Sequence, residues 1–415
     1  MTTSPLEKER SFLGRMADLL GIPAYRLLLL NSVFGSMRLI TVFVARGWLV
    51  LTITDSPFWV GAAPAVRGFT QILAGTFAGV LLDRVSRRTA LILVEIGNSI
   101  VPFTLGVLIF LGEIQLWHVL AASFVEGLLI AVRWPAISTM TLSIVGRKRL
   151  LNASAANMFG FNLGNIGASV LAGFIIDQFG IDSAYFFAAA CGLMAGLLAW
   201  VIRGDFTPRM PTVKESVLDS IREGLIYIRS KPSLVWLILL GFLMSLFGWS
   251  NLTMLPVMAR DVLGQAASGL GILTGAGALG SLISTGIIAG SSQSQDKSRL
   301  VMISGLLTTA AILAFSYSTW FPLSVALVAF MQAALMAFEV TIGASVLTVT
   351  SDKMQGRVQG VYNQVFGFTW IGGALLGAIA EFLGAPIAIA FGGIGIGLVV
   401  LLARRPLIRM RKELI

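Results

Sequence analysis

Cysteine, histidine and charged residues are all scarce in this chain of 415 residues. It contains one cysteine, Cys191, and one histidine, His118. A single cysteine excludes a disulfide bond within the chain, and one histidine leaves no cluster of the kind that binds a metal ion. The same scarcity leaves little material for a nucleophile with its base, so neither an enzyme nor a cofactor is expected.

Charged residues make up 12% of the sequence, and hydrophobic residues make up 56%. Soluble domains carry roughly 25% charged residues, about twice as many. The mean hydropathy is +0.87. These values indicate that the main solvent of this chain is a lipid bilayer. The formal net charge of +10 would suggest a nucleic-acid partner in a soluble protein, but the distribution of the cations gives another explanation.

Twelve apolar stretches are each long enough to cross about 30 Å of hydrocarbon, which takes roughly 20 residues. They predict an all-α membrane protein with twelve transmembrane helices. The N-terminal segment lacks an apolar core followed by a small-residue cleavage site, so the first stretch is kept as a helix. The predicted spans are 27–53, 60–82, 89–111, 117–144, 153–179, 184–202, 234–258, 267–289, 300–317, 322–349, 358–382 and 386–403.

Lysine and arginine fall almost entirely on one side of these spans. With the N-terminus inside, 25 of the 30 lie in the inner segments, and the outer connections contain only Arg260. Cytoplasmic loops of membrane proteins are enriched in these residues. Both termini are therefore expected to be cytoplasmic, in a bacterial cytoplasmic (inner) membrane, and nucleic acid is not expected as a partner. The remaining four cations lie within spans: Arg38, Arg46, Arg67 and Arg133.

Two pairs of segments indicate an internal duplication. FVEGLLIAVRWPAIST begins at Phe124 and FMQAALMAFEVTIGAS at Phe330, while MFGF begins at Met158 and VFGF at Val365. The two offsets, 206 and 207 residues, agree. Repeats of this kind are common in transporters. They predict two pseudo-symmetric six-helix bundles.

The longest connection joins these bundles. The expected domains are residues 1–203, a cytoplasmic linker over 204–233, and residues 234–415. Within the linker, Leu218, Ile221, Leu225 and Ile228 share one face of a helix. This pattern is typical of an amphipathic helix on the cytoplasmic membrane surface. A solvated linker helix that packs on its own domain is the alternative.

A short motif, GVLLDRVSRR, follows the second predicted span. It resembles the signature that the major facilitator superfamily carries between its second and third helices, which is a glycine, then Asp-Arg, then a basic pair. The resemblance implies a cytoplasmic gate. The residues of this gate would be Gly79, Asp83, Arg84, Arg87 and Arg88.

The chemistry of the motif suits a gate. Gly79 permits close approach of another helix. Asp83 lies at the C-terminal end of its own helix, where an anion is unfavourable, so it is expected to face the N-terminus of another helix. In the family this partner is the eleventh helix, which would begin here near Val358. Ordinary positive-inside anchoring would explain the arginines but not the acid among them.

Three further segments sharpen the resemblance. LTITDSPFWVG, LPVMARDVLG and QGRVQGVYNQ are similar to segments of the bacterial exporter branch that contains the enterobactin exporter and macrolide efflux proteins. The likeness extends over nearly the whole chain. It implies the twelve-helix major facilitator fold, alternating access and proton-driven export. It does not determine the substrate, because this branch handles siderophores, macrolides and other compounds.

Charged residues within membrane spans are costly and often mark transport pathways. Arg38, Arg133 and Glu339 lie near the middle of the first, fourth and tenth spans, which line the central cavity in the family fold. We expect them to contact substrate. Arg133 and Glu339 occupy equivalent positions of the two repeats and are expected to be coupled across the cavity. Purely structural ion pairs are the alternative.

A second layer of charge, formed by Arg46, Arg67 and Glu126, lies closer to the outside. Glu126 and Glu339 are the candidate proton carriers, because a carboxylate shielded from water can bind and release a proton. Glu95, in the third span, is expected to be a structural partner of cytoplasmic basic residues.

Four tryptophans in the spans could stack on an aromatic substrate, although packing or interfacial anchoring is favoured. They are Trp48, Trp134, Trp249 and Trp370.

These observations predict a monomeric secondary active transporter that exports small amphiphilic compounds, drug-like or siderophore-like, by proton-coupled antiport. Two cations at one depth favour an anionic or amphiphilic substrate. Lysophospholipid flipping and solute uptake are alternatives within the same fold. An enzyme embedded in the membrane is a further alternative, which the residue composition disfavours.

Overall fold

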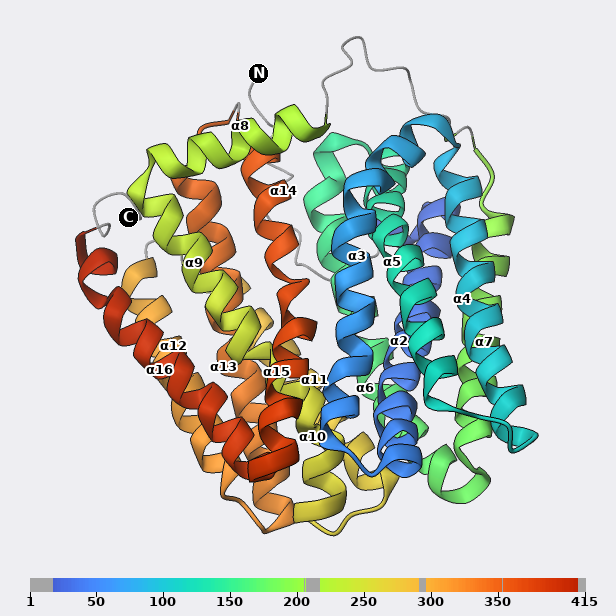
Figure 1. Cartoon of the computed structure of the whole chain (residues 1–415). Helices are drawn as coiled ribbons and strands as arrows, with labels where there is room; N and C mark the ends of the chain where they lie inside the picture. Colours follow the sequence, from blue (N-terminus) through green and yellow to red (C-terminus); the bar gives the residue numbers. More distant parts are fainter. Residues whose placement is uncertain (1–17, 205, 207–216, 291–295, 353, 410–415) are drawn as a thin grey trace.

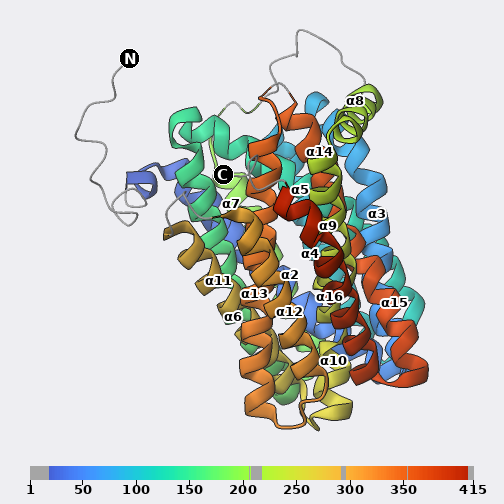
Figure 2. The same cartoon turned by 90° about the vertical axis from the view of Figure 1, so that its left-hand side faces the viewer.

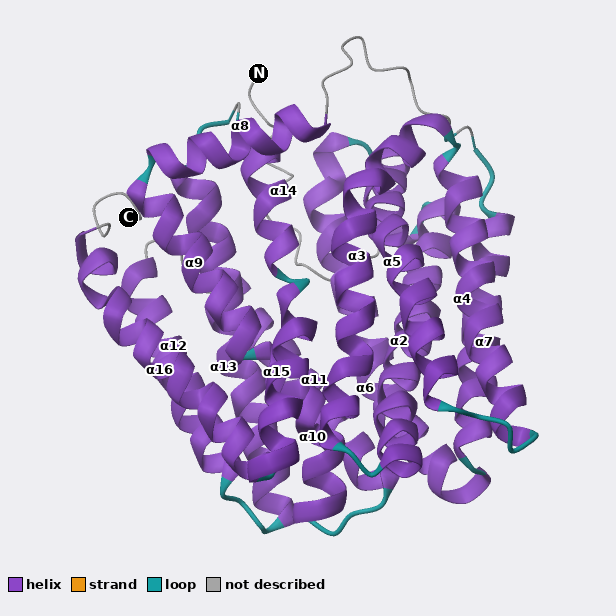
Figure 3. Ribbon diagram, viewed as in Figure 1, coloured by secondary structure: helices purple, strands orange, loops and turns teal. Residues whose placement is uncertain are grey.

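The computed structural model describes residues 18–204, 206, 217–290, 296–352 and 354–409. Within these ranges, residues 76–84, 217–221, 289–290 and 408–409 are described by their backbone alone. Helices and the loops between them account for all of the described chain, which contains no strand (Figure 3). Eleven stretches of the described residues are long and apolar enough to cross a membrane.

The first six predicted spans each correspond to one helix. Short polar or glycine-containing turns separate them, and internal prolines such as Pro64, Pro102 and Pro135 do not end them. α3 has 28 residues and runs between the same two ends of the molecule as its neighbours (Figure 1). These helices are α2 (Pro23–Thr54), α3 (Pro57–Arg84), α4 (Arg87–Phe110), α5 (Leu116–Val145), α6 (Leu150–Phe179) and α7 (Ile181–Val201).

The last six spans include two that are interrupted. The seventh span is α9 (Pro232–Phe247) followed by the short turns η3 (Trp249–Met254), α10 (Leu255–Val257) and η4 (Met258–Val262), and the eleventh is α14 (Gln355–Val365) followed by α15 (Phe368–Leu383). The uninterrupted spans are α11 (Ala267–Gly290), α12 (Lys297–Ser316), α13 (Phe321–Val349) and α16 (Ala385–Arg409).

One interruption contains a proline and the other a glycine, and both residue types disfavour a continuous helix. Pro256 has no backbone N–H and cannot continue the hydrogen bonding of the seventh span. Gly367, between α14 and α15, lies against α3, and a Cβ atom there would be 2.3 Å from Ile72 Cγ1. The sequence predicted both spans as continuous helices, because apolar length carries no information about such breaks.

The two sets of six helices lie side by side (Figures 1 and 2). They meet where α3 packs against α15 and where α6 packs against α11. Glycines allow these close approaches. A Cβ atom at Gly61 would be 2.0 Å from Gly373 O, and one at Gly173 would be 2.4 Å from Ala267 O.

The linker helix, α8 (Val217–Ser230), lies across one end of the second set of helices (Figure 1). Glu223 pairs with Arg357 of α14 at 2.6 Å, and Tyr227 accepts a hydrogen bond from Ser351 N at 3.1 Å. Of the predicted apolar face, Ile228 is buried and Leu225 is exposed, while the side chains of Leu218 and Ile221 lie outside the described residues. α8 therefore packs on the second half through polar contacts as well as through Ile228.

Candidate functional site

A cavity of about 270 Å³ lies between the two halves. Its wall combines aromatic and thioether side chains with a few polar ones, and Arg67 is the one ionisable side chain among the described residues that line it. The aromatic residues come from α2, α6, η3 and α15 and are Phe43, Phe161, Trp249 and Trp370. The polar residues other than Arg67 are Asn162, Asn165, Thr274, Ser281 and Gln332.

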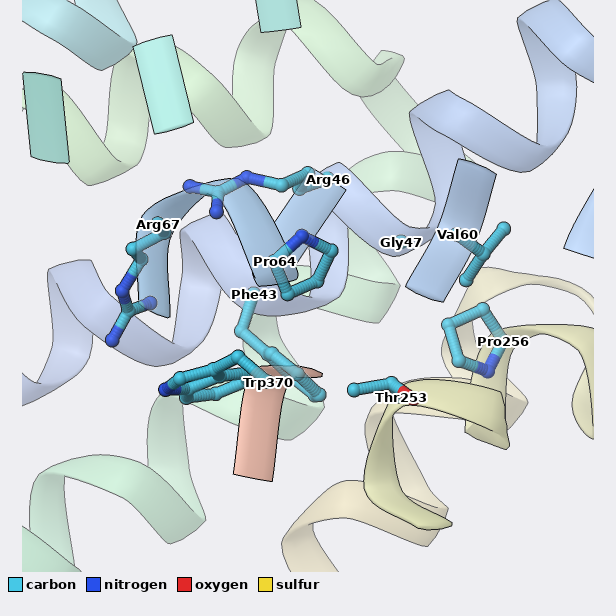
Figure 4. Close-up of a pocket in the computed structure, with 9 residues that line it drawn as sticks. All are labelled: Phe43, Arg46, Gly47, Val60, Pro64, Arg67, Thr253, Pro256 and Trp370. Carbon is cyan, nitrogen blue, oxygen red and sulfur yellow. The ribbon is translucent and has the colours of Figure 1, made fainter. Parts of the chain in front are cut away.

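Arg67 and Trp370 form a contact between the halves at the cavity wall. Figure 4 shows both residues where they also line a smaller neighbouring pocket. The guanidinium carbon of Arg67, on α3, lies 4.8 Å from the centre of the Trp370 ring, on α15. Phe43 of α2 packs against the same tryptophan, with 6.4 Å between ring centres. Gly68 makes room for this arrangement, because a Cβ atom there would be 2.6 Å from Trp370 Cβ. A cation over an indole face is a stabilising interaction.

The first half contains two buried ion pairs. Arg133 Nε of α5 donates to Glu95 Oε1 of α4 at 2.8 Å, and Arg46 of α2 pairs with Glu126 of α5. All four side chains are at most 5% exposed. The prediction that Glu95 pairs with cytoplasmic basic residues is wrong, because its described cationic partner is Arg133, within the spans. The prediction used only the depth of Glu95 along its helix, which does not show in which direction the Glu95 and Arg133 side chains point.

Arg38 is also buried, at 2% exposure, and its Nε has no hydrogen-bond partner among the described residues. The charged side chains that act on it electrostatically are Glu95, Glu126, Arg133 and Arg46. With Arg67, six buried charged side chains therefore lie together in the described spans of the first half. Four are cations and two are anions, which leaves an excess of two positive charges.

Glu339, on α13, lies in the second half and has a different environment. The hydroxyl of Tyr362, on α14, donates to Glu339 Oε1, and Glu339 also interacts with Trp249 of the cavity wall. Its Oε2 is buried without a hydrogen-bond partner, and no ion pair to it is found within the described part of the chain.

The structure does not bring together the three predicted mid-depth residues. Arg133 is paired with Glu95 and Glu339 with Tyr362, so the expected cross-cavity pair is not formed here. Arg38, Arg133 and Glu339 are absent from the described lining of the cavity. Of the four tryptophans, Trp249 and Trp370 line it, whereas Trp134 packs on Phe161 with 5.2 Å between ring centres.

The predicted cytoplasmic gate is described only in part. Gly79, Asp83 and Arg84 are described by their backbone alone, so the contacts of the Asp83 and Arg84 side chains are outside the described structure. Arg87 NH1 donates to Ser143 Oγ of α5 at 3.0 Å, and Arg88 donates to the carbonyl of Trp200 in α7. These two arginines thus tie the start of α4 to neighbouring helices of the first half.

At the end away from α8, two carboxylates each hold the N-terminus of a helix in the other half. Asp177, in the last turn of α6, accepts from Ala267 N at 3.0 Å and Ser268 N at 2.9 Å, at the start of α11. We call this contact the first latch. An anion at the C-terminal end of its own helix is unfavourable, and the positive N-terminus of the partner helix compensates for it.

The second latch is formed by Glu381, in the last turn of α15, with Ser56 and Phe58 at the start of α3. Ser56 Oγ donates to Glu381 Oε2 at 2.7 Å, and Phe58 N donates to the same oxygen at 3.1 Å. Asp177 and Glu381 are 204 residues apart, close to the repeat offset. The two latches are therefore related by the internal duplication.

Arg260 adds a third contact at this end. It lies in η4, at the end of the seventh span, and reaches into the first half, where it pairs with Asp55 and donates from NH1 to Leu51 O at 3.1 Å. The sequence placed Arg260 alone among the outer connections and gave it no role. It joins the halves at the end that the latches close.

Comparison with known proteins identifies the family. A profile described as transmembrane secretion effector, within the major facilitator superfamily, matches residues 17–414. The chain belongs to this family. It is 26% identical to the enterobactin exporter EntS of Escherichia coli O1:K1 over 418 residues, which cover 97% of each chain. The enterobactin exporter EntS of Shigella boydii serotype 18 is also 26% identical, over 415 residues and 97% of each chain.

Solved structures show the same fold. The nucleoside transporter NupG superposes with a TM-score of 0.71 at 12% identity, over 93% of this chain and 99% of that one. A bacterial homologue of the human lysosomal transporter Spinster superposes with a TM-score of 0.69 at 14% identity, over 94% and 97%. The predicted all-α major facilitator fold is confirmed. The chain is thus a multi-pass membrane transporter of a small-molecule substrate, and its relatives are not enzymes.

Proposed function

We propose that this protein exports small amphiphilic compounds from a bacterial cell by alternating access across the cytoplasmic membrane. The observation that carries the proposal is the cavity between the halves, with its aromatic wall, polar amides and single guanidinium. Ligand sites are mostly apolar, with a few polar groups that fix orientation. Such a wall suits a compound with an apolar body and a polar head. The relatives of the chain that are named as exporters support the direction.

The latches support alternating access. Both of them, and the Arg260 contact, lie at the end away from α8. With the cytoplasmic orientation predicted from lysine and arginine, this end faces the outside. We therefore interpret the structure as inward-facing, a conformation that the Spinster homologue is also described as having. In this proposal residues 1–203 and 234–415 rock against each other, joined by residues 204–233, within a monomer.

We further propose that transport is coupled to protons through Glu339. Glu126 was the other candidate, but its carboxylate is held by the permanently charged Arg46. The Glu339 carboxylate is bonded to a neutral tyrosine and lies next to Trp249 of the cavity wall. A carboxylate without a cation can bind a proton at lower cost than one in an ion pair. Arg38 and Arg133 would supply positive charge behind the cavity wall.

The test is accumulation of fluorescent amphiphilic dyes in a strain that lacks its own efflux systems. Expression of the protein should lower accumulation, and Phe161→Ala, in the cavity wall, should reduce that effect. Phe124→Ala is the matched control, because Phe124 lies on the same half and is 50% exposed. Purified protein in liposomes that moves only lipid analogues would favour a flippase, and dye uptake would favour an importer. Either result would contradict export.

A further inference from the structure

We propose that Arg67 is the anchor for an anionic group of the substrate, and that Trp370 and Phe43 hold its apolar body. The inference rests on the proposed function and names the class of substrate: aromatic or apolar acids with one negative charge. It differs from the prediction made from depth alone, which placed Arg67 in an outer layer and chose Arg38, Arg133 and Glu339 as contacts.

Arg67 has no counter-anion among the described residues. Its side chain forms no ion pair within the described part of the chain, and its Nε is buried without a hydrogen-bond partner. The residue is 6% exposed, and its charged group packs on the face of Trp370. A buried cation is costly unless an anion or several hydrogen bonds compensate for it. The ring offers only part of that compensation.

The neighbouring carboxylates already form ion pairs with other arginines. Glu126 is the anion that acts on Arg67 electrostatically, and its ion-pair partner is Arg46. Glu95 is paired with Arg133. Among the described residues, the two buried cations of the first half without an ion-pair partner are Arg38 and Arg67, and of these Arg67 is the one that lines the cavity. A ligand anion at Arg67 would therefore neutralise part of an existing excess of positive charge.

The same cavity offers complementary groups for the rest of the ligand. Asn165 Oδ1 and Gln332 Oε1 line it and are buried without hydrogen-bond partners. Amide groups can supply either a donor or an acceptor after rotation. The ligand that satisfies all of these groups has a negative charge beside Arg67, an aromatic or apolar body along Phe43 and Trp370, and hydrogen-bonding groups for Asn165 and Gln332.

Binding at Arg67 would also act on the contact between the halves. Arg67 lies on α3 of the first half, and Trp370 lies on α15 of the second. A ligand anion competes with the ring for the guanidinium. An occupied site would thus weaken one bridge between the halves.

The experiment compares three probes with the same aromatic body: 2-naphthoate, 2-naphthylmethanol and 2-naphthylmethylammonium. Their dissociation constants are measured by calorimetry on the purified full chain. The wild type should bind the anion about tenfold more tightly than the neutral probe, and Arg67→Gln should remove this preference without changing the affinity for the neutral one. Arg67→Lys should keep part of it. Arg203→Gln is the matched control, because Arg203 is exposed at the end of α7.

Three results would overturn the inference. They are equal binding of the three probes by the wild type, no binding of 2-naphthoate at millimolar concentration, and an unchanged preference in both Arg67 variants. The proposed export function is judged separately by dye accumulation. Export of neutral dyes by a protein that does not prefer 2-naphthoate would refute the anion site and leave export intact. Preference for 2-naphthoate without any export would refute the export function and leave the anion site intact.

Discussion

In the first half, the buried carboxylates of Glu95 and Glu126 each have an arginine partner, whereas the carboxylate of Glu339 in the second half is bonded to the hydroxyl of Tyr362. The two pairs of the first half join α4 to α5 and α2 to α5. Such pairs hold helices in place and fix the charge of both partners. The Glu339 carboxylate, in contrast, has no cationic partner among the described residues, which is why we propose it as the proton carrier.

In the mechanism we propose, this difference divides the roles of the halves. The first half supplies an excess of positive charge at and behind the cavity wall, and the second half supplies Glu339, the proposed proton carrier. Glu339 lies beside Trp249, which contacts both the carboxylate and the cavity. A change of charge at Glu339 is therefore felt at the wall where substrate is proposed to bind.

The largest expected effect comes from breaking a pair of the first half. Glu95→Gln leaves Arg133 buried without its anion, which should lower the free energy of unfolding by about 3–5 kcal/mol. Glu339→Gln removes a carboxylate that has no described cationic partner and should cost much less. Thermal unfolding of the purified variants measures both. The double change Glu95→Gln, Arg133→Gln should be milder than Glu95→Gln alone. Equal losses for the Glu95 and Glu339 variants would erase the contrast between the halves.

A smaller but more specific effect is expected on coupling. Glu339→Gln should abolish the dependence of transport on the proton gradient, because an amide cannot bind and release a proton in this range. Substrate exchange at equal pH should persist. Transport by liposomes with and without a pH gradient measures the two modes. Glu126→Gln serves as the comparison: by disrupting the pair with Arg46 it should weaken both modes together. A Glu339→Gln variant that still follows the gradient would remove Glu339 from the proton path.

The twelve-helix fold could be predicted from the sequence because it depends on quantities that a sequence contains directly. Apolar stretches of about 20 residues set the spans, and the repeat offset related the halves. Even so, the breaks near Pro256 and at Gly367 were missed. Gly367 lies at a contact with Ile72 of another helix, which no local pattern reports. A proline alone does not mark a break either, because Pro64, Pro102 and Pro135 lie inside continuous helices.

The site was harder to predict, because depth along a helix does not give direction around it. Arg133 and Glu339 occupy equivalent positions at similar depth, yet Arg133 turns to Glu95 in its own half. Arg67 was judged by depth and assigned to an outer layer, although it reaches the cavity. The neighbouring residue, Gly68, leaves space for Trp370. This glycine indicates that another chain segment lies close to Arg67, but the sequence does not show that the segment is α15.

The helix-dipole effect expected for Asp83 applies to two other acids in the described structure. An acid at the end of its own helix was expected to face the N-terminus of a partner helix at the cytoplasmic side. Asp177 and Glu381 do this at the opposite end. No motif in the sequence drew attention to them, because each is a single acid at the end of an apolar stretch.

The last prediction tests whether these two latches are equivalent, as the repeat suggests. Asp177→Asn and Glu381→Gln each remove an anion from a helix N-terminus, which should cost the closed end roughly 0.3–1 kcal/mol per latch. The population open at this end should rise by a similar factor in both. The latches lie on different helix pairs, so the free-energy changes of the two single variants should add in the double variant.

The measurement uses Thr253→Cys, at a small pocket beside the closed end, in a Cys191→Ser background. Its labelling from outside by a membrane-impermeant thiol reagent reports opening at this end. Asp182→Asn is the control, because Asp182 lies at the same end, in the first turn of α7, and forms neither latch. Unequal effects of the two latch variants would mean that the two latches are not equivalent. The halves would then differ at this end as well as in their buried charged residues. Labelling that Asp182→Asn raises as much as they do would mean that net charge, rather than contact with a helix N-terminus, keeps the end closed.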